Sequence, residues 1–163
     1  MIDKLKPTMR GDIETAAAVA RFMKERDQYA RTLGIELLEL GPGRCRAQLA
    51  LGPHLVNGLG MAHGAAVFSV ADFAFAGACN SYGRTAVALS MDIHFLSSPP
   101  ADARLIAEAV EVRTGGRTAL YRMTVTDGEE NLVAELHGMA YLKGDYFLGE
   151  STEPSGNRQE KQS

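Results

Sequence analysis

The chain has 163 residues, of which 45% are hydrophobic and 23% are charged, a composition typical of one globular domain. Its net charge of −3 and its pI near 5.8 lack the basic excess that nucleic-acid-binding proteins carry, so no nucleic-acid partner is expected.

The cysteines and the apolar segments exclude further classes. The two cysteines, Cys45 and Cys79, form no CxxC or Cys/His cluster, which argues against a metal site and a disulfide framework. Residues 1–11 lack the apolar core of a secretory signal. The longest apolar run, residues 62–79, includes Asp72 and falls short of the roughly 20 residues that a membrane span needs. We therefore expect a cytoplasmic protein with reduced thiols and no membrane partner.

The first expected element is an amphipathic helix. Residues 1–11 are expected to form a flexible leader, and Asp12 is a suitable N-cap. Between Asp12 and Gly34 the apolar side chains recur at helical spacing, at Val19, Phe22, Met23, Ala30 and Leu33. Because Gly is a frequent helix terminator, one continuous helix is predicted over residues 12–34.

After Gly34 the apolar period changes to two, which indicates half-buried strands. Strands are expected at residues 35–40, 44–51, 87–95, 103–113, 121–125 and 131–142, with a hairpin turn at Asp127–Gly128. In the strand at 87–95, the alternation places Val87, Leu89 and Met91 on one apolar face. It places Ser90 on the opposite face.

The end of the chain differs in composition from the rest. Residues 144–163 are rich in Ser, Glu, Gln, Gly and Asn, and they cannot bury enough apolar surface to offset the entropy of ordering. We expect a disordered tail there, after a domain that spans residues 12–143.

A buried helix is predicted between the second and third strands, within residues 57–81 (NGLGMAHGAAVFSVADFAFAGACNS). Its one carboxylate, Asp72, is the only acidic side chain between Glu39 and Asp92. An ionised Asp is costly in such a helix unless it is paired, hydrogen-bonded or protonated. Two interpretations remain open from the residues alone. Asp72 is a catalytic carboxylate, or it is satisfied by neighbouring groups such as Ser69.

Gly64 is expected to open this helix. The N–H groups of a first turn have no partner within the helix and favour an anion, which suits an oxyanion hole. The alternative is a glycine needed only for tight packing of the helix on the sheet. Gly64 and Asp72 are eight residues apart (72 − 64), which is about 12 Å along a helix. One carbonyl cannot contact both within a single helix. If both groups act on it, they must come from different subunits.

An antiparallel sheet around one central helix, with an additional N-terminal helix, makes an α+β chain that resembles the hotdog fold. Specifically, it resembles the thioesterase family of phenylacetic acid degradation. Asn57, the pair His63–Gly64 and the string ADFAFAGACNS at 71–81 carry the resemblance. The strings SMDIHFL at 90–96 and TGGRTALY at 114–121 extend it more weakly. It covers roughly residues 12–143.

The resemblance implies hydrolysis of acyl-coenzyme A thioesters whose acyl group is aromatic, of the phenylacetyl or hydroxyphenylacetyl type. Asp72 matches the base or nucleophile and Gly64 the oxyanion donor, while His63 and Asn57 match positions that orient the thioester and the attacking water. Ser90 matches a hydroxyl near the carboxylate, although the alternation directs it away from the helix. The family builds its sites at a two-fold interface, which implies at least a homodimer and a homotetramer formed as a dimer of dimers.

Two of these polar residues also have a plainer interpretation. His63 could be a helix-start residue that bonds the backbone, and Asn57, followed by Gly58, could be a turn residue with positive φ.

The chain departs from the family pattern at two places. Ala65 replaces a second glycine after the histidine, and Ser97–Ser98 replaces an Arg-Pro pair, which removes one coenzyme A contact of the family. Arg113, Gly116 and Arg117, around a predicted hairpin turn, remain as candidates for contact with the phosphates. Solvated hairpin charges explain them equally well. No cofactor is implied, because coenzyme A is part of the substrate.

Two other functions stay open. A hotdog enoyl-coenzyme A hydratase or dehydratase would use a histidine and an acid, which His63 and Asp72 could imitate. A non-catalytic acyl-coenzyme A sensor usually carries a DNA-binding segment, and this sequence shows no basic helix.

Overall fold

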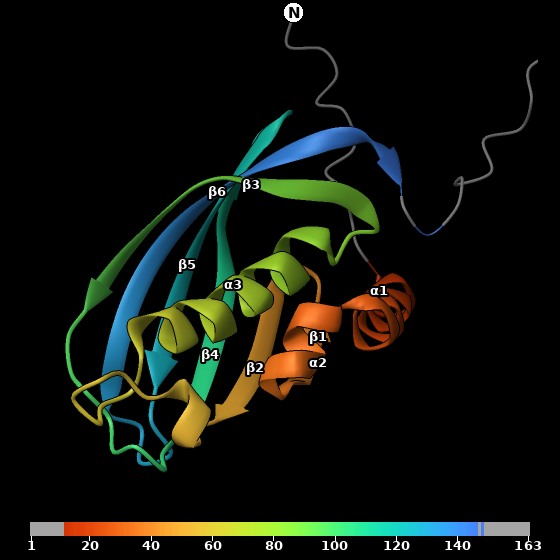
Figure 1. The fold of residues 1–163 in the computed structure, drawn as a ribbon. Coiled ribbons are helices and arrows are strands. Elements are labelled where there is room, and N and C mark those ends of the chain that lie inside the picture. The colour runs from red at the N-terminus through yellow and green to blue at the C-terminus, as the bar shows by residue number, and fades with distance from the viewer. Residues whose placement is uncertain (1–11, 147, 149–163) are drawn as a thin grey trace, which may run out of the picture.

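A long central helix lies against the concave face of a curved antiparallel sheet, and two shorter helices flank it (Figure 1). This architecture is seen in a computed structural model that describes residues 12–146 and 148. The helices are α1 (Ile13–Arg26), α2 (Gln28–Leu33) and α3 (Gly64–Asn80), with a short 3-10 turn at Pro53–Leu55. The strands are β1 (Ile35–Gly41), β2 (Arg44–Ala50), β3 (Arg84–Phe95), β4 (Arg104–Thr114), β5 (Thr118–Thr126) and β6 (Leu132–Tyr146).

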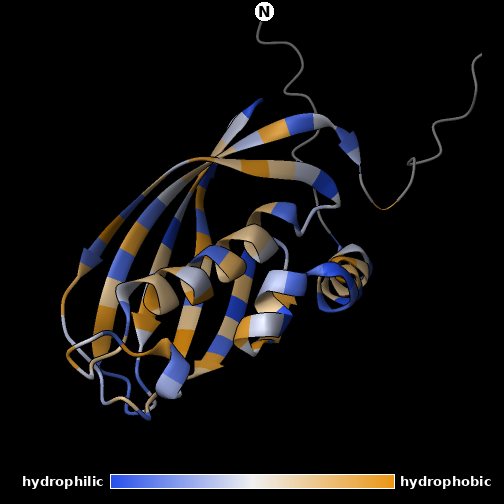
Figure 2. Ribbon diagram, viewed as in Figure 1, coloured by the Kyte–Doolittle hydropathy of each residue, from blue (hydrophilic) through white to orange (hydrophobic). Residues whose placement is uncertain are grey.

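The six strands form one sheet in the order β1-β2-β4-β5-β6-β3, and every neighbouring pair is antiparallel. Figure 2 shows the alternation of hydrophobic and hydrophilic residues along these strands, which leaves one face of the sheet to pack on α3. The predicted α+β hotdog class is therefore confirmed. The strands β1 and β3 form the two edges of the sheet.

The helix α3 approaches the sheet closely because glycines lie at two contacts. A Cβ atom on Gly77 would lie 2.6 Å from Cys45 Sγ, and one on Gly138 of β6 would lie 2.9 Å from a ring carbon of Phe75. The Phe75 ring meets Tyr121 edge to face, with centroids 5.5 Å apart. The result is a continuous core between α3 and the strands.

The single helix predicted over residues 12–34 is wrong. The chain forms α1 and α2, separated at Asp27, which ends α1 and caps α2 by accepting a hydrogen bond from Ala30 N–H at 2.8 Å. The predicted ends are confirmed. Asp12 caps α1 by accepting from Thr15 N–H, and Gly34 ends α2 with φ of 78°. The hydrogen bond from Ala30 N–H to the Asp27 side chain thus replaces the backbone bonding of a continuous helix at this point.

The apolar face predicted for β3 is wrong in its first half. The register against β6 shifts between Ala88 and Ser90, so the alternation changes sides there. Val87 and Leu89 are 41% and 57% exposed, while Met91 packs against the core.

The hairpin predicted at Asp127–Gly128 forms, but its loop spans residues 127–131, and the positive φ falls on Glu130. The strand β6 continues to Tyr146, past the domain boundary predicted at residue 143. The predicted leader at 1–11 and the tail residues 147 and 149–163 lie outside the described residues. No helix in the described part of the chain combines the length and hydropathy needed to cross a membrane.

Candidate active site

The carboxylate of Asp72 lies at the middle of α3, on the one side of the helix that the sheet does not cover. The side chain is half-buried, and no hydrogen bond or ion pair reaches its carboxylate from residues 12–146 or 148. The partner considered for it, Ser69, is engaged elsewhere. Its hydroxyl donates to Ala65 C=O at 2.7 Å and lies 2.9 Å from the Tyr29 hydroxyl. Within the described residues, the interpretation that Ser69 satisfies the Asp72 carboxylate is therefore not supported.

The environment of Asp72 favours its protonated form. Burial raises the pKa of the Asp72 carboxyl above its ordinary value, and the negative charge of Asp27 raises it further. A carboxylate with a raised pKa accepts a proton more readily at neutral pH, which is the property that general-base catalysis requires.

The N-terminus of α3 presents one backbone donor. The N–H of Ala65 donates to His63 Nδ1 at 3.0 Å, and the N–H groups of Ala66 and Val67 donate to His63 C=O. The N–H of Gly64 has no acceptor within the described part of the chain. A Cβ at Gly64 would lie 3.2 Å from Phe95 Cζ, so tight packing also favours glycine here.

His63 is the N-cap of α3. Because Nδ1 accepts the Ala65 N–H, the neutral imidazole carries its proton on Nε2, which leaves Nε2–H as a donor. The residue is exposed and borders a hollow of about 210 Å³ whose other walls include Tyr29, His54 and Ser69. The backbone-bonding role is thus observed, and it leaves the other ring nitrogen for a ligand.

Asn57 anchors the turn before α3. Its side-chain oxygen accepts from Leu59 N–H at 2.9 Å and from Met61 N–H at 3.1 Å. Its φ is not positive, contrary to one expectation, and Gly60 supplies the positive φ of this turn. With its oxygen engaged, the Asn57 amide N–H₂ remains as a donor without a partner among the described residues.

Several of the predicted site residues lie away from Gly64 at the start of α3. Ser90 is exposed and pairs with Met139, next to the shifted register, on the face of the sheet opposite to Met91. Arg113 and Arg117 are exposed in the β4–β5 hairpin. That hairpin lies beside the start of β3, since Arg84 donates to Gly116 C=O, so it is near the C-terminal end of α3 and far from Gly64.

Two residues near Asp72 were missed from the sequence. Asp27 influences Asp72 through its charge, and Tyr29 meets Ser69, one turn before Asp72. Both come from the α1–α2 junction, which the prediction of one unbroken helix concealed. The sequence does contain one signal of this break, because Asp27 is a residue type that often caps the start of a helix.

Comparisons with known proteins agree with the fold and show the family. A family model described as the thioesterase superfamily matches residues 59–134. The acyl-coenzyme A thioesterase PaaI of Escherichia coli K12 is 33% identical over 132 residues, which are 81% of this chain and 94% of that protein. The structure of the E. coli PaaI protein from the phenylacetic acid degradation operon superposes with a TM-score of 0.79 at 32% identity, covering 82% of this chain and 96% of that one. A variant of the phenylacetic acid degradation protein PaaI from Thermus thermophilus superposes with a TM-score of 0.67 at 37% identity. The match covers 69% of this chain and 96% of that one.

The fold and the relatives together define the class as a hotdog thioesterase, a hydrolase of thioester bonds. The chain belongs to the thioesterase superfamily, in the group of PaaI-type acyl-coenzyme A thioesterases.

Proposed function

We propose that this enzyme hydrolyses acyl-coenzyme A thioesters with an aromatic acyl group, using Asp72 of one subunit and Gly64 of another at each site. The observation that carries the proposal is the pair of groups without partners on α3. The half-buried Asp72 carboxylate and the Gly64 N–H both lack a hydrogen-bond partner among the described residues. A base and an oxyanion donor are what thioester hydrolysis needs.

The reaction follows from these two groups. Asp72 takes a proton from water as the water oxygen bonds to the thioester carbon, and the carbonyl oxygen becomes an oxyanion that accepts from Gly64 N–H. The C–S bond then breaks, and the thiolate of coenzyme A receives the proton from Asp72. In the alternative route, Asp72 attacks the carbon itself, expels the thiolate and forms an anhydride that water opens. His63 Nε2–H and the Asn57 amide orient the thioester and the water.

The assembly we propose is a homodimer, with a homotetramer formed by two such dimers. Phe68 is midway between Gly64 and Asp72. A two-fold axis near Phe68 would therefore place Gly64 of each subunit beside Asp72 of the partner subunit. The edge strand β3 supports this arrangement. No strand among the described residues pairs with its outer edge, and Val87 and Leu89 are 41% and 57% exposed beside it.

The aromatic acyl group and a role in phenylacetate degradation are proposed from the relatives. The E. coli and Thermus proteins are both named for phenylacetic acid degradation. Coenzyme A would extend away from the acyl group, toward the β4–β5 hairpin of the subunit that supplies Gly64, where Arg113 and Arg117 are exposed and Gly116 leaves room for a phosphate.

The test is a thiol-release assay across acetyl-, octanoyl-, phenylacetyl- and 4-hydroxyphenylacetyl-coenzyme A. The proposal expects the largest kcat/KM with the two aromatic substrates. Hydration of crotonyl-coenzyme A, measured in parallel, should be absent. Hydration without thiol release would replace this proposal with the hydratase alternative.

A further inference from the structure

A hollow between α1 and α3 begins one turn beyond Asp72. On α3, Asp72, Ala76 and Asn80 recur every four residues and so share one side of the helix. Ala76 and Asn80 form one wall of the hollow, and Phe22 and Met23 of α1 form the other. Four residues of helix rise about 6 Å, so the hollow opens about 6 Å from the Asp72 backbone. We call it the α1–α3 hollow.

The polar residues of the α1–α3 hollow already have partners. The Asn80 amide donates to Ala76 C=O at 2.9 Å, and its oxygen accepts from Ala86 N–H at 2.9 Å. The Thr85 hydroxyl donates to Asp145 at 2.9 Å, and the Arg26 guanidinium lies 5.8 Å from the centre of the Phe22 ring. Beside the charged groups of Arg26 and Asp27, which also line it, the hollow offers a ligand the apolar surface of Phe22, Met23 and Ala76.

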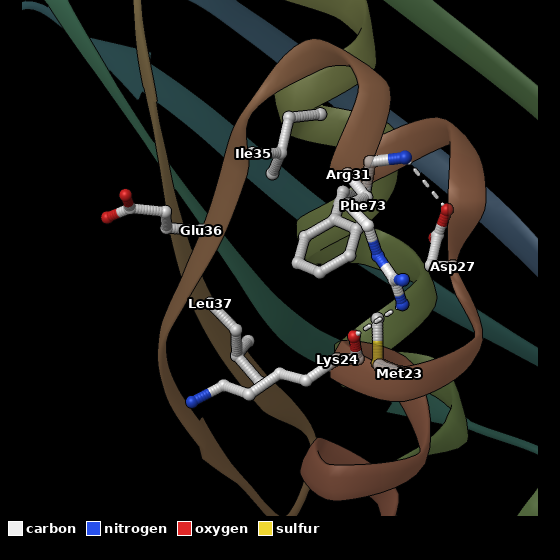
Figure 3. A pocket seen from close by; sticks show the side chains of 9 residues that line it. Met23, Lys24, Asp27, Arg31, Ile35, Glu36, Leu37 and Phe73 are labelled. Atoms are coloured by element: carbon white, nitrogen blue, oxygen red, sulfur yellow. Dashed lines mark hydrogen bonds between the residues drawn. The ribbon is translucent and has the colours of Figure 1, made fainter.

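A second hollow lies on the other side of Met23. It is bounded by α1, α2 and β1, and Figure 3 shows Met23, Ile35, Leu37 and Phe73 around it. Phe73 is one residue after Asp72 and so points about 100° away around α3. Charged groups stand beside these apolar side chains, including Lys24 and Glu36. The α3 residue that lines this second hollow is Phe73, whereas the α1–α3 hollow is lined by Ala76 and Asn80 on the Asp72 side of the helix.

Met23 and Asp27 line both hollows, so they form the partition between them. The hollows enclose about 370 and 340 Å³ respectively, each within the usual range for small ligands. Met23 is the movable part of this wall, because a methionine side chain is unbranched and adapts its shape to what it contacts.

We infer that the α1–α3 hollow receives the acyl group of the substrate, with an aromatic ring against Phe22 and Met23, and that Met23 limits how long that group can be. The inference rests on the proposed function, since it places the acyl carbonyl at Asp72. A flat ring suits this hollow, because aromatic faces and a thioether both pack favourably against it. Met23 is then a specificity-determining residue that contacts substrate and takes no part in the proton transfers.

The first test compares three variants in the thiol-release assay. Met23→Ala should join the two hollows and raise the ratio of kcat/KM for octanoyl- over phenylacetyl-coenzyme A by about tenfold or more, within the range known for apolar pockets. Ala76→Leu should fill the hollow and lower the ratio for phenylacetyl- over acetyl-coenzyme A by a similar factor. Met139→Ala, a half-buried methionine of β6, is the matched control and should change neither ratio. Unchanged ratios in both test variants would overturn the inference.

The second test needs neither turnover nor a variant. In protein labelled with ¹³C at the methionine methyl groups, phenylacetate should shift the Met23 signal through the ring current and leave the Met139 signal in place. If the wild-type enzyme hydrolyses no acyl-coenzyme A but Met23 still responds, the proposed function fails and the hollow stands. If the enzyme hydrolyses phenylacetyl-coenzyme A and Met23 does not respond, the hollow is not the acyl site.

Discussion

Gly64 and Asp72 stand at the first and ninth positions of α3, and each presents a group that has no hydrogen-bond partner within residues 12–146 and 148. The helix separates them by about 12 Å, so they cannot act on one carbonyl within one subunit. The proposed mechanism depends on this separation as much as on the chemistry of the two groups.

Replacing Asp72 by Asn should lower kcat by about 10²–10⁴-fold, because Asn keeps the shape and removes the base. Retention of more than about a tenth of the activity would show that Asp72 is not the base.

The same variant should be more stable than the wild type at pH 7. Burial raises the pKa of Asp72 in the folded protein, so the ionised form opposes folding at neutral pH. The difference should shrink as the pH falls through that raised pKa, and it should vanish below the ordinary value of about 3.9, where the carboxyl is protonated in both states. Urea unfolding of both proteins between pH 3 and pH 7 measures this.

Replacing Asp27 by Asn should move the acid limb of the pH profile of kcat/KM to lower pH. The negative charge of Asp27 raises the pKa of Asp72, so its removal lets Asp72 ionise at lower pH. Asn is as good an N-cap as Asp, so α2 should survive. Glu25→Gln, on the exposed surface of α1, is the matched charge control and should leave the limb in place. Equal displacement in both variants would contradict the assigned role of Asp27.

Two substitutions at Gly64 distinguish a role of its backbone N–H from a role of its small size. Gly64→Pro removes the N–H and should cost about 10²–10³-fold in kcat. The backbone tolerates it, since His63 is extended (φ −70°, ψ 131°) and Gly64 is in the first turn. Gly64→Ala keeps the N–H but places a Cβ 3.2 Å from Phe95 Cζ. Adding Phe95→Leu should restore activity to the alanine variant and not to the proline variant. Equal rescue of both would assign Gly64 to packing alone.

Replacing His63 by Asn separates capping from catalysis. Asn caps helices well, so stability should stay close to wild type, while loss of Nε2–H should lower kcat/KM by about 10²-fold. His63→Ala loses the cap as well and should cost about 1 kcal/mol of stability in addition. Thermal melts and kinetics on both variants provide the comparison. If His63→Asn keeps full activity, capping α3 is the only role of His63 and the residue takes no part in catalysis.

Much of the fold was predictable because its signals are local. The long apolar run between Gly64 and Asn80 indicates a buried helix. An apolar period of two indicates the strands wherever that period is unbroken. The shift between Ala88 and Ser90 escaped detection because Val87, Ala88 and Leu89 are all apolar, so the sequence there fits either face. The break at Asp27 escaped because apolar spacing continues on both sides of it.

The site was predictable where one residue is chemically out of place, as Asp72 is in an apolar helix. Its neighbours were not. The proximity of Asp27 and the contact between Tyr29 and Ser69 join residues about forty positions apart, and no local pattern specifies such a contact. Gly64 was predicted as a donor from its place in the first turn. The structure adds that His63 accepts the other N–H groups of that turn, which leaves the Gly64 N–H without an acceptor among the described residues.

The most direct test of the shared site uses dimers purified through two different tags, one on each subunit. In a dimer of Asp72→Asn with Gly64→Pro, a shared site leaves one centre with both lesions and the other with neither, so about half of the wild-type activity should remain. In a dimer of wild type with a subunit that carries both changes, each centre has one lesion, so activity should be nearly absent. If the first dimer is inactive and the second keeps half of the activity, Gly64 and Asp72 act within one subunit and the account is contradicted.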